Sequence, residues 1–376
     1  MFSFDIKEHN FSHVHFIGIG GISMSGLAEI LLEKDYEVSG SDKNPSLIID
    51  RLKHQGAKIY IGHSAENING SDLVVYTDAI SDDNVELMQA KKMGIETVDR
   101  GTFLGKLMKN YKRSIAVSGT HGKTTTTSMI ATVLNKSELE PTILLGGELD
   151  TIGGNVKIGS NNLVITEACE YKGNILKYQP TMAIILNMEE DHLDYFKNID
   201  HIVDTFAQYA NRIEKDGYLI INMDDEHSQK VIDSSNCNII TFGINKTADY
   251  TAENISFTKE GYAKFVLNVK NTKKYLVTLN VMGIHNIYNA LATFAACHTY
   301  GSPLEYIIDS IKDYVGTHRR LEAKGCINGV KIIDDYAHHP TEIKLSLKAL
   351  KNTTKNRLWC VFQHHTYSRT KKLLDK

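Results

Sequence analysis

The chain has 376 residues, of which 42% are hydrophobic and 23% are charged, a composition that excludes a disordered protein and a single small domain. Its 42 basic and 45 acidic side chains give a net charge of −3, which argues against a nucleic-acid-binding protein, since such proteins normally carry a basic excess. No apolar run approaches the roughly 18 residues that a membrane helix needs, and the polar start MFSFDIKEHN is not a secretory signal. We therefore expect a cytoplasmic, multi-domain α/β protein with no membrane or nucleic-acid partner.

In the first part of the chain, short apolar runs alternate with helical patterns. HVHFIGIGG leads into SMSGLAEILLEK, which predicts a strand, a glycine turn and a helix, and YEVSGSD and SDLVVYTDAI predict further strands. This rhythm is typical of a parallel sheet with helices on its faces. We predict a Rossmann-like domain over residues 1–109.

The same pattern restarts twice. SIAVSGTHGKTTTTSMIATVL opens a second α/β domain, predicted over residues 110–316, in which LVITEACE and MAIILNMEEDH form buried strands. GVKIIDDYAHHP followed by TEIKLSLKAL opens a third domain over residues 317–376. Because 60 residues are too few for a three-layer domain, we expect this last part to be the truncated start of a Rossmann-like domain.

The segment GTHGKTTTT, residues 119–127, lies between a predicted strand and a predicted helix. Glycines in such a loop let backbone N–H groups converge on phosphate oxygens, and the helix adds its positive end. Lys123 can reach the β- and γ-phosphates, and the Thr124 hydroxyl can bind Mg²⁺. The common pattern has glycine six positions before the lysine, where this chain has Val117, so we predict a shorter phosphate-binding loop. The alternative is an ordinary glycine turn.

The first glycine segment, GIGGISMSG, also follows a strand and opens a helix. It is compatible with a nicotinamide or flavin cofactor, with the pyrophosphate of a nucleotide sugar, or with a tight packing turn alone. Ser23 stands where the third glycine of the dinucleotide pattern would be.

Two further groups of residues are candidates for nucleotide chemistry. Glu167 and His192 each follow a predicted parallel strand, so they should meet beside the phosphate-binding loop, where they could hold Mg²⁺. Magnesium prefers oxygen ligands, so His192 could equally be a hydrogen-bonding loop residue. Asn286 and Asn289 share one face of a predicted helix, where they could contact adenine or serve as a cap and a surface amide.

The motifs GTHGKTTTT, EACEY, NMEEDHLDYF, HNIYNALA, the pair Arg319-Arg320 and DDYAHHPTE occur in the order and spacing of the Mur ligases. The chain resembles this family over its whole length, and HFIGIGGISMSGLAEIL and HTYSRT are most similar to its alanine-adding branch. The resemblance implies an α/β protein of three domains: a Rossmann-like N-terminal domain, a P-loop central domain and a Rossmann-like C-terminal domain. It also implies ligation of L-alanine to the lactyl carboxylate of UDP-N-acetylmuramate through an acyl phosphate, with ATP and Mg²⁺, in peptidoglycan synthesis and hence in cell shape and division.

The resemblance also implies roles for residues at matching positions. The substrate-binding residues would be Gly18, Gly20, Gly21, Ser23, Met24, Asp42 and Thr77 for the UDP-sugar, and His338, His365 and Arg369 for the muramyl carboxylate and the amino acid. The ATP-binding residues would be Gly119, Thr120, His121, Gly122, Lys123, Thr124, Thr125, Asn286, Asn289, Arg320 and Asp335. The metal ligands would be Thr124, Glu167 and His192, and the catalytic residues Lys123, Glu167, His192 and Arg320.

Four alternatives compete with this hypothesis. A recycling ligase would attach a tripeptide to the same UDP-sugar. Folylpolyglutamate synthetase would not need the first glycine loop. A nicotinamide-dependent dehydrogenase would leave GTHGKTTTT and Glu167 without a role. A non-catalytic nucleotide-binding regulator would not need the lysine and metal positions. The sequence does not identify the general base for the amine, for which Asp335, His338 and His365 are candidates.

Overall fold

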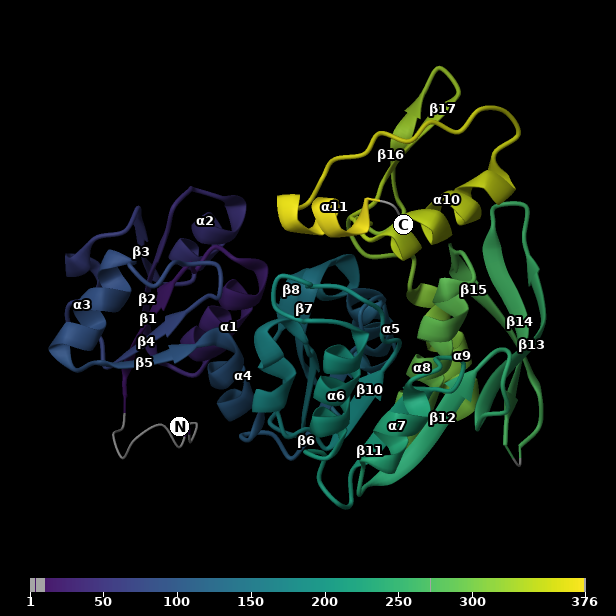
Figure 1. Ribbon diagram of the computed structural model, residues 1–376, viewed down its shortest axis with the longest axis horizontal. Helices are drawn as coiled ribbons and strands as arrows, with labels where there is room; N and C mark the ends of the chain where they lie inside the picture. The colour runs from purple at the N-terminus through teal and green to yellow at the C-terminus, as the bar shows by residue number, and fades with distance from the viewer. Residues whose placement is uncertain (1–3, 5–10, 271, 375–376) are drawn as a thin grey trace.

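The computed structural model describes residue 4 and residues 11–270 and 272–374, which form two α/β domains and a smaller third unit (Figure 1). The first domain has a five-stranded parallel sheet in the order β3-β2-β1-β4-β5. Its strands are β1 His13–Ile17, β2 Glu37–Asp42, β3 Lys58–Ile61, β4 Leu73–Tyr76 and β5 Glu96–Asp99, and its helices are α1 Ile22–Glu33, α2 Leu47–His54, α3 Val85–Met93 and α4 Arg100–Met108. Every residue of β1 is buried, as expected for a parallel strand covered on both faces.

The central domain is built on a ten-stranded sheet in the order β15-β14-β13-β12-β11-β10-β6-β9-β7-β8. Its strands are β6 Arg113–Ser118, β7 Thr142–Leu149, β8 Gly154–Lys157, β9 Leu163–Glu167, β10 Met182–Ile185, β11 Tyr218–Asn222, β12 Asn238–Gly243, β13 Tyr250–Phe257, β14 Tyr262–Val269 and β15 Tyr275–Met282. Its helices are α5 Lys123–Leu134, α6 Ile199–Ala210, α7 Ser228–Asp233, α8 His285–Thr299 and α9 Leu304–Ser310.

The strands β7, β9, β6, β10, β11, β12 and β13 run parallel, while β8, β14 and β15 pair antiparallel with their neighbours. The prediction of parallel sheets was therefore incomplete at both edges. In β14 buried and more exposed residues alternate, the pattern of an antiparallel strand with one face in the core. Helices α5 and α8 pack against each other and are buried along most of their lengths.

The first and central domains meet at the start of α1. The Asn155 side chain, on β8, donates to the carbonyl of Ile22 at 2.7 Å and accepts from Arg51 at 2.7 Å. A second contact joins Lys177 to Asp99 at 2.6 Å. These contacts attach the start of α1, helix α2 and the end of β5 to the central domain.

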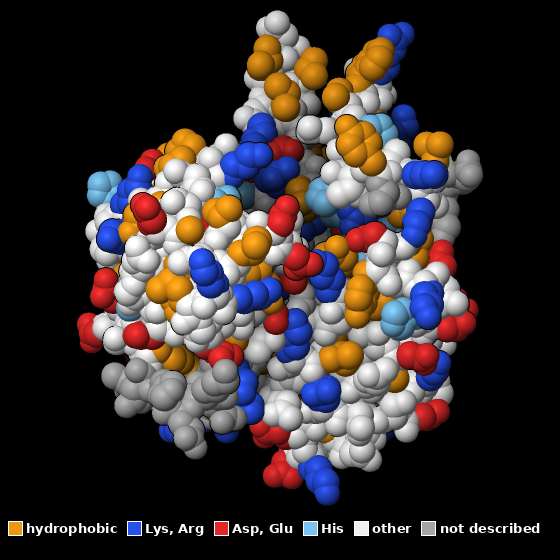
Figure 2. All heavy atoms as spheres, turned by 60° about the vertical axis from the view of Figure 1, so that its left-hand side comes forward, with side chains coloured by type: hydrophobic (Ala, Val, Ile, Leu, Met, Phe, Trp, Pro, Cys, Tyr) orange, Lys and Arg blue, Asp and Glu red, His pale blue; other side chains and the backbone are white. Residues whose placement is uncertain are grey.

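The third unit comprises a hairpin of β16 Glu322–Ile327 and β17 Val330–Asp334, followed by α10 Pro340–Thr353 and α11 Tyr367–Leu373. The predicted strand in GVKIIDDYAHHP and the helix after it are confirmed, but the antiparallel hairpin partner was not predicted. The hairpin projects away from the central domain and exposes Ile327, Val330 and Ile332 (Figures 1 and 2). Within the part of the chain that the structure describes, no helix combines the length and apolar character needed to cross a membrane.

Candidate active site

The second glycine loop joins β6 to α5, so the predicted strand, loop and helix are all present. Gly122 precedes the first turn of α5 with a φ of +84°, and a Cβ there would lie 2.6 Å from Asn289 Oδ1. The position therefore requires glycine for both its conformation and its space. The backbone N–H of His121 donates to Asn187 Oδ1 at 2.8 Å, which fixes the loop against the end of β10.

Lys123 folds back over this loop. Its Nζ donates to the carbonyls of Gly119 and Thr120 and forms an ion pair with Glu170 Oε2 at 3.2 Å. Burial alone would lower the pKa of Lys123, but the Glu170 carboxylate outweighs burial and raises it above the ordinary value. The Lys123 ammonium group is therefore charged, and its partners are the Glu170 carboxylate and two backbone carbonyls of the loop.

Thr124 and Glu167 also meet beside the loop. The Thr124 hydroxyl donates to Glu167 Oε2 at 3.1 Å, and Glu167 Oε1 accepts the backbone N–H of Gly146. A hydroxyl and a carboxylate are donors of the kind that Mg²⁺ prefers, so these two residues fit the ion.

His192 lies in the loop after β10 with a φ of +49°. Its Nε2 is 3.9 Å from Glu170 Oε1 and 3.8 Å from Asp191 Oδ2. Burial lowers the pKa of His192, so its imidazole is neutral at pH 7 and can act as a ligand or an acceptor. Glu170 thus contacts both His192 and the Lys123 ammonium group.

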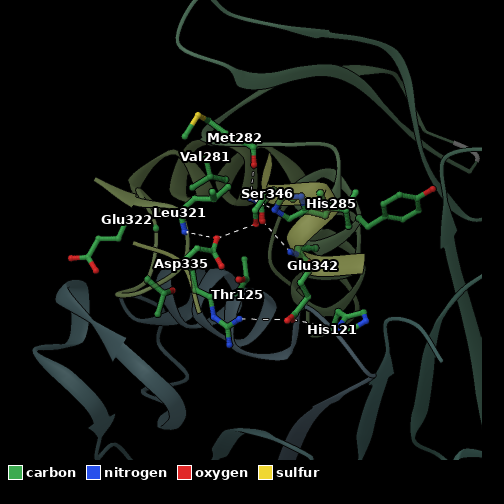
Figure 3. Close-up of a pocket in the computed structure, with 18 of the residues that line it drawn as sticks. His121, Thr125, Val281, Met282, His285, Leu321, Glu322, Asp335, Glu342 and Ser346 are labelled. Carbon is green, nitrogen blue, oxygen red and sulfur yellow. Dashed lines mark hydrogen bonds and ion pairs between the residues drawn. The ribbon is translucent and has the colours of Figure 1, made fainter. Parts of the chain in front are cut away.

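A cavity of about 580 Å³ opens from the loop towards the third domain (Figure 3). The central domain contributes His121, Gly122, Thr125, Asn286 and Asn289 to its walls, and the third domain contributes Arg320, Asp335, Glu342 and Ser346. Asn286 donates to the Met282 carbonyl at 2.7 Å and accepts from Asn289, whose own oxygen accepts from Thr126. Both amides are buried inside α8, so the alternative of a cap and a surface amide was wrong.

Arg320 and Asp335 both line this cavity, but their side chains have different partners. Arg320 lies 3.9 Å from Glu342 Oε1, with its guanidinium 5.4 Å above the Tyr336 ring. Asp335 accepts the backbone N–H groups of Leu321 and Ala337 and the Ser346 hydroxyl, and burial raises its pKa. The carboxylate of Asp335 therefore organises the third domain itself as well as lining the cavity.

The first glycine loop is closed by contacts within its own domain. Gly18 has a φ of +83°, and a Cβ there would lie 2.6 Å from Thr77 Cγ2. The Gly20 N–H donates to Asp42 Oδ2 at 2.9 Å, and Ser23 accepts from Arg100 at 3.3 Å. The Met24 side chain is buried in the core, so only its backbone can face a ligand.

A second cavity of about 280 Å³ lies between the third domain and the loop that carries His192. Arg369 donates to both oxygens of Asp191, at 2.9 and 3.1 Å, and Arg369 Nη1 lies 2.6 Å from His365 Nδ1. The rings of His338 and His365 stack with centroids 4.7 Å apart. The structure therefore brings His192, His365 and Arg369 to one cavity, with His338 beside it.

Comparisons of the sequence and the fold with known proteins agree with this arrangement of domains and loops. The sequence signature of the Mur ligase middle domain matches residues 117–297, that of the Mur ligase family catalytic domain matches 13–112, and that of the Mur ligase glutamate ligase domain matches 319–376. The chain is 54% identical over 372 residues to UDP-N-acetylmuramate–L-alanine ligase of Acetivibrio thermocellus, spanning 99% of this chain and 79% of that protein. This chain belongs to the Mur ligase family.

Other relatives agree. The UDP-N-acetylmuramate–L-alanine ligase of Clostridium acetobutylicum is 52% identical over 99% of this Mur ligase and 81% of the relative. The crystal structure of UDP-N-acetylmuramate-alanine ligase from Thermotoga maritima has a TM-score of 0.82 at 31% identity, covering 92% of this chain and 79% of that one. A murein peptide ligase from Psychrobacter arcticus has a TM-score of 0.80 at 26% identity, covering 92% and 77%. The predicted three-domain α/β architecture of a Mur ligase is confirmed.

Several charged residues of this Mur ligase were not predicted as site residues. Arg100 contacts Ser23, Glu170 holds Lys123, Glu189 and Glu342 flank His121, and Asp191 holds Arg369. Four of them lie within EACEY, NMEEDHLDYF or DDYAHHPTE, so the motifs contained the signal although their partners are distant in sequence. The predicted glycine loop is present, Thr124 contacts Glu167, and Arg320 lines the same cavity as the loop. The carboxylates beside His192 are those of Glu170 and Asp191.

Proposed function

We propose that this Mur ligase joins L-alanine to the lactyl carboxylate of UDP-N-acetylmuramate and converts ATP to ADP and phosphate, in the cytoplasm and as a step in peptidoglycan precursor synthesis. The observation that carries the proposal is the cavity in which a phosphate-binding loop of the central domain faces Arg320 of the third domain. Relatives that match 99% of the chain at 52–54% identity are named for this reaction, which supports the alanine-adding assignment.

The chemistry follows from the weakness of a carboxylate as an acylating agent, since its leaving group would be oxide. Transfer of the γ-phosphoryl group of ATP to the lactyl carboxylate forms an acyl phosphate and releases ADP. The amine of L-alanine then attacks the carbonyl carbon, loses a proton and expels phosphate. Both steps depend on correctly placed positive charge, and neither needs a covalent bond between enzyme and substrate. We assign the neutralising charge to Lys123, whose ammonium would leave the loop carbonyls for phosphate oxygens, and to Arg320.

The remaining ATP contacts are proposed on the cavity walls. The backbone of residues 119–122 would bind the phosphates, Thr125 would line their site, and Asn286 and Asn289 would lie towards the adenine. We propose that Thr124, Glu167 and His192 hold Mg²⁺, which neutralises phosphate charge when bound. Because Glu167 also accepts the Gly146 N–H, its carboxylate is already oriented for that role.

The UDP-sugar would bind at the first glycine loop. We propose that Gly18, Gly20 and Gly21 let the pyrophosphate approach the start of α1, where the backbone N–H groups of Ser23 and Met24 would face it. The Gly20 N–H holds Asp42 and the Gly21 N–H holds the Gly18 carbonyl, so these two groups shape the loop. Asp42 would approach the uridine while bracing the loop, and Thr77 would close its other side. Met24 would contribute through its backbone.

The amino acid would bind in the second cavity, with Arg369 near its carboxylate. Among the three candidates for the base, Asp335 has both oxygens engaged and His365 contacts Arg369 and Tyr336 through its two ring nitrogens. His338 donates from Nδ1 to the Tyr336 carbonyl, which leaves Nε2 as the acceptor position. Burial lowers the pKa of His338 to about 4, so its imidazole is neutral at pH 7. We therefore propose that His338 Nε2 accepts the proton that the amine loses.

A ligase for a tripeptide on the same UDP-sugar is the second candidate, because the fold also matches a murein peptide ligase with a TM-score of 0.80. The two are separated by measuring phosphate release with ATP, UDP-N-acetylmuramate and either L-alanine, other amino acids or the tripeptide. We expect release with L-alanine and none with the tripeptide. Release with the tripeptide alone would reverse the assignment, and reduction of a nicotinamide cofactor would indicate the dehydrogenase alternative.

A further inference from the structure

Beside the nucleotide cavity, three side chains from separate segments converge on one point. His121 comes from the phosphate-binding loop, Glu189 from the segment after β10, and His339 from the residue that precedes α10 in the third domain. One ligand atom of each lies within 4.8 Å of the other two. The His339 side chain is 5% exposed and the His121 side chain 11% exposed, whereas the Glu189 side chain is 38% exposed, so two buried imidazoles meet a carboxylate that solvent can reach.

One of these atoms has no hydrogen bond. His121 Nε2 is buried without a hydrogen-bond partner among the described residues, and lies 3.5 Å from Glu189 Oε2. Its other nitrogen, Nδ1, faces Glu342 Oε1 at 3.3 Å (Figure 3). A carboxylate on Nδ1 orients the ring so that Nε2 points at Glu189, which is the arrangement found behind metal-bound histidines.

His339 has the same arrangement with its nitrogens exchanged. Its Nε2 lies 3.1 Å from the Glu190 carbonyl, which makes Nε2 the protonated nitrogen and directs the Nδ1 lone pair inward. Nδ1 lies 3.9 Å from Glu189 Oε2 and accepts only a long bond of 3.3 Å from the Thr341 N–H. Glu189 Oε2 is itself held by the Thr341 hydroxyl at 2.6 Å. Each of the three side chains is thus oriented by a second polar group.

We propose that His121 Nε2, Glu189 Oε2 and His339 Nδ1 form a binding site for a zinc-type divalent transition metal, separate from the Mg²⁺ position at Thr124 and Glu167. Two imidazoles and a carboxylate are a zinc donor set, whereas Mg²⁺ favours oxygen. Tetrahedral zinc needs ligand atoms about 3.4 Å apart, which the 3.5 Å separation of His121 Nε2 from Glu189 Oε2 already matches. His339 Nδ1, at 3.9 Å from Glu189 Oε2 and within 4.8 Å of His121 Nε2, has to move inward on binding. A water molecule or a nucleotide phosphate oxygen completes the four ligands.

The site would have a structural consequence for this Mur ligase. Because His339 belongs to the third domain and His121 to the phosphate-binding loop, a bound ion fastens the two together over the nucleotide cavity. His121 Nε2 must carry no proton when the ion binds, so the metal competes with protons for this nitrogen.

The test uses Co²⁺, which gives strong visible absorption only in tetrahedral sites and can then be displaced by Zn²⁺. The titration is carried out at pH 8 on the chain freed of metal, without nucleotide and with excess Mg²⁺ to fill the oxygen-rich position. We expect a tetrahedral Co²⁺ spectrum with one ion per chain, and about 100-fold weaker binding in Glu189→Gln and in His339→Asn. Asparagine is chosen because it retains a side chain that can cap α10.

Two variants serve as controls. His227→Ala removes an imidazole from the neighbouring cavity that Glu189 and His339 also line, and it should leave the Co²⁺ spectrum and affinity unchanged. His192→Ala should also retain the spectrum. An octahedral spectrum in the parent chain, unchanged affinity in His339→Asn, or loss of the signal in His192→Ala would overturn the proposal.

Discussion

The two glycine loops of this Mur ligase have the same local construction but are completed in different ways. The first is closed by neighbours in its own domain, with Gly20 donating to Asp42 and Gly18 packing against Thr77. The second is surrounded by charge, since Lys123 pairs with Glu170 and His121 faces Glu342 from the third domain. The first loop therefore takes its shape from its own domain, whereas the second is also contacted by another domain from outside.

The largest difference between the loops should appear on removal of Lys123. Lys123→Ala should lower kcat by about 1,000-fold, equivalent to about 4 kcal/mol, because the ammonium neutralises charge on the transferring phosphoryl group. The affinity for UDP-N-acetylmuramate should not change, because we propose its site in the first domain. Steady-state kinetics and a binding titration measure the two effects. Lys230→Ala, which removes a half-exposed lysine paired with Asp204, should behave as the parent, and near-normal turnover in Lys123→Ala would remove the loop from the mechanism.

The second prediction concerns the charge that the third domain brings to the loop. Burial would lower the pKa of His121, but Glu189 and Glu342 outweigh burial and raise it to about 9 from 6.5. A raised pKa stabilises the folded chain below pH 6.5, and this contribution is lost as pH rises through about 9, amounting to about 3 kcal/mol. Denaturant unfolding with EDTA should show this loss in the parent chain and a smaller one in Glu342→Gln. Equal losses in the two proteins would contradict the pairing.

The third prediction tests the proposed Mg²⁺ ligands beside the second loop. Glu167→Gln and His192→Ala should each raise the Mg²⁺ concentration needed for half-maximal turnover, and lower turnover itself, by about tenfold to hundredfold. Since both residues are proposed to act on one ion, the double variant should lose less than the product of the single effects. A Mg²⁺ titration of turnover in the three variants provides the measurement. Strictly multiplicative losses with unchanged Mg²⁺ dependence would instead favour His192 as a loop residue.

The smallest effect is expected at the first loop. Gly18→Ala places a Cβ 2.6 Å from Thr77 Cγ2, so the loop must shift and the KM for UDP-N-acetylmuramate should rise about tenfold, or about 1.4 kcal/mol, with the KM for ATP unchanged. Gly94→Ala is a matched control, because Gly94 has a similar φ of +72° with open space around it. It carries the same backbone strain without the collision. If both variants changed KM alike, the effect would be a general loss of stability.

The sequence by itself determined the units of strand, glycine turn and helix that recur along the chain. Strands such as β1 and β6, the glycine turns that follow them and the helices α1 and α5 could be predicted, because buried parallel strands and glycine loops have short-range patterns. The motif order also identified the family, which the comparisons confirmed. Thr124 and Glu167 could be expected to meet because the ends of adjacent parallel strands share one edge of a sheet.

Only the tertiary structure decided which charges pair. Glu342 is more than 200 residues from His121 in sequence, and Arg369 is similarly distant from Asp191, so no local pattern connects them. The same is true of Asp335, which the family resemblance assigns to ATP and which the fold also uses to hold Leu321 and Ser346. Residue type and spacing determine what a side chain can do, whereas the partner of a buried charge depends on how separate domains pack, because burial leaves a charge stable only where an opposite charge or a hydrogen bond reaches it.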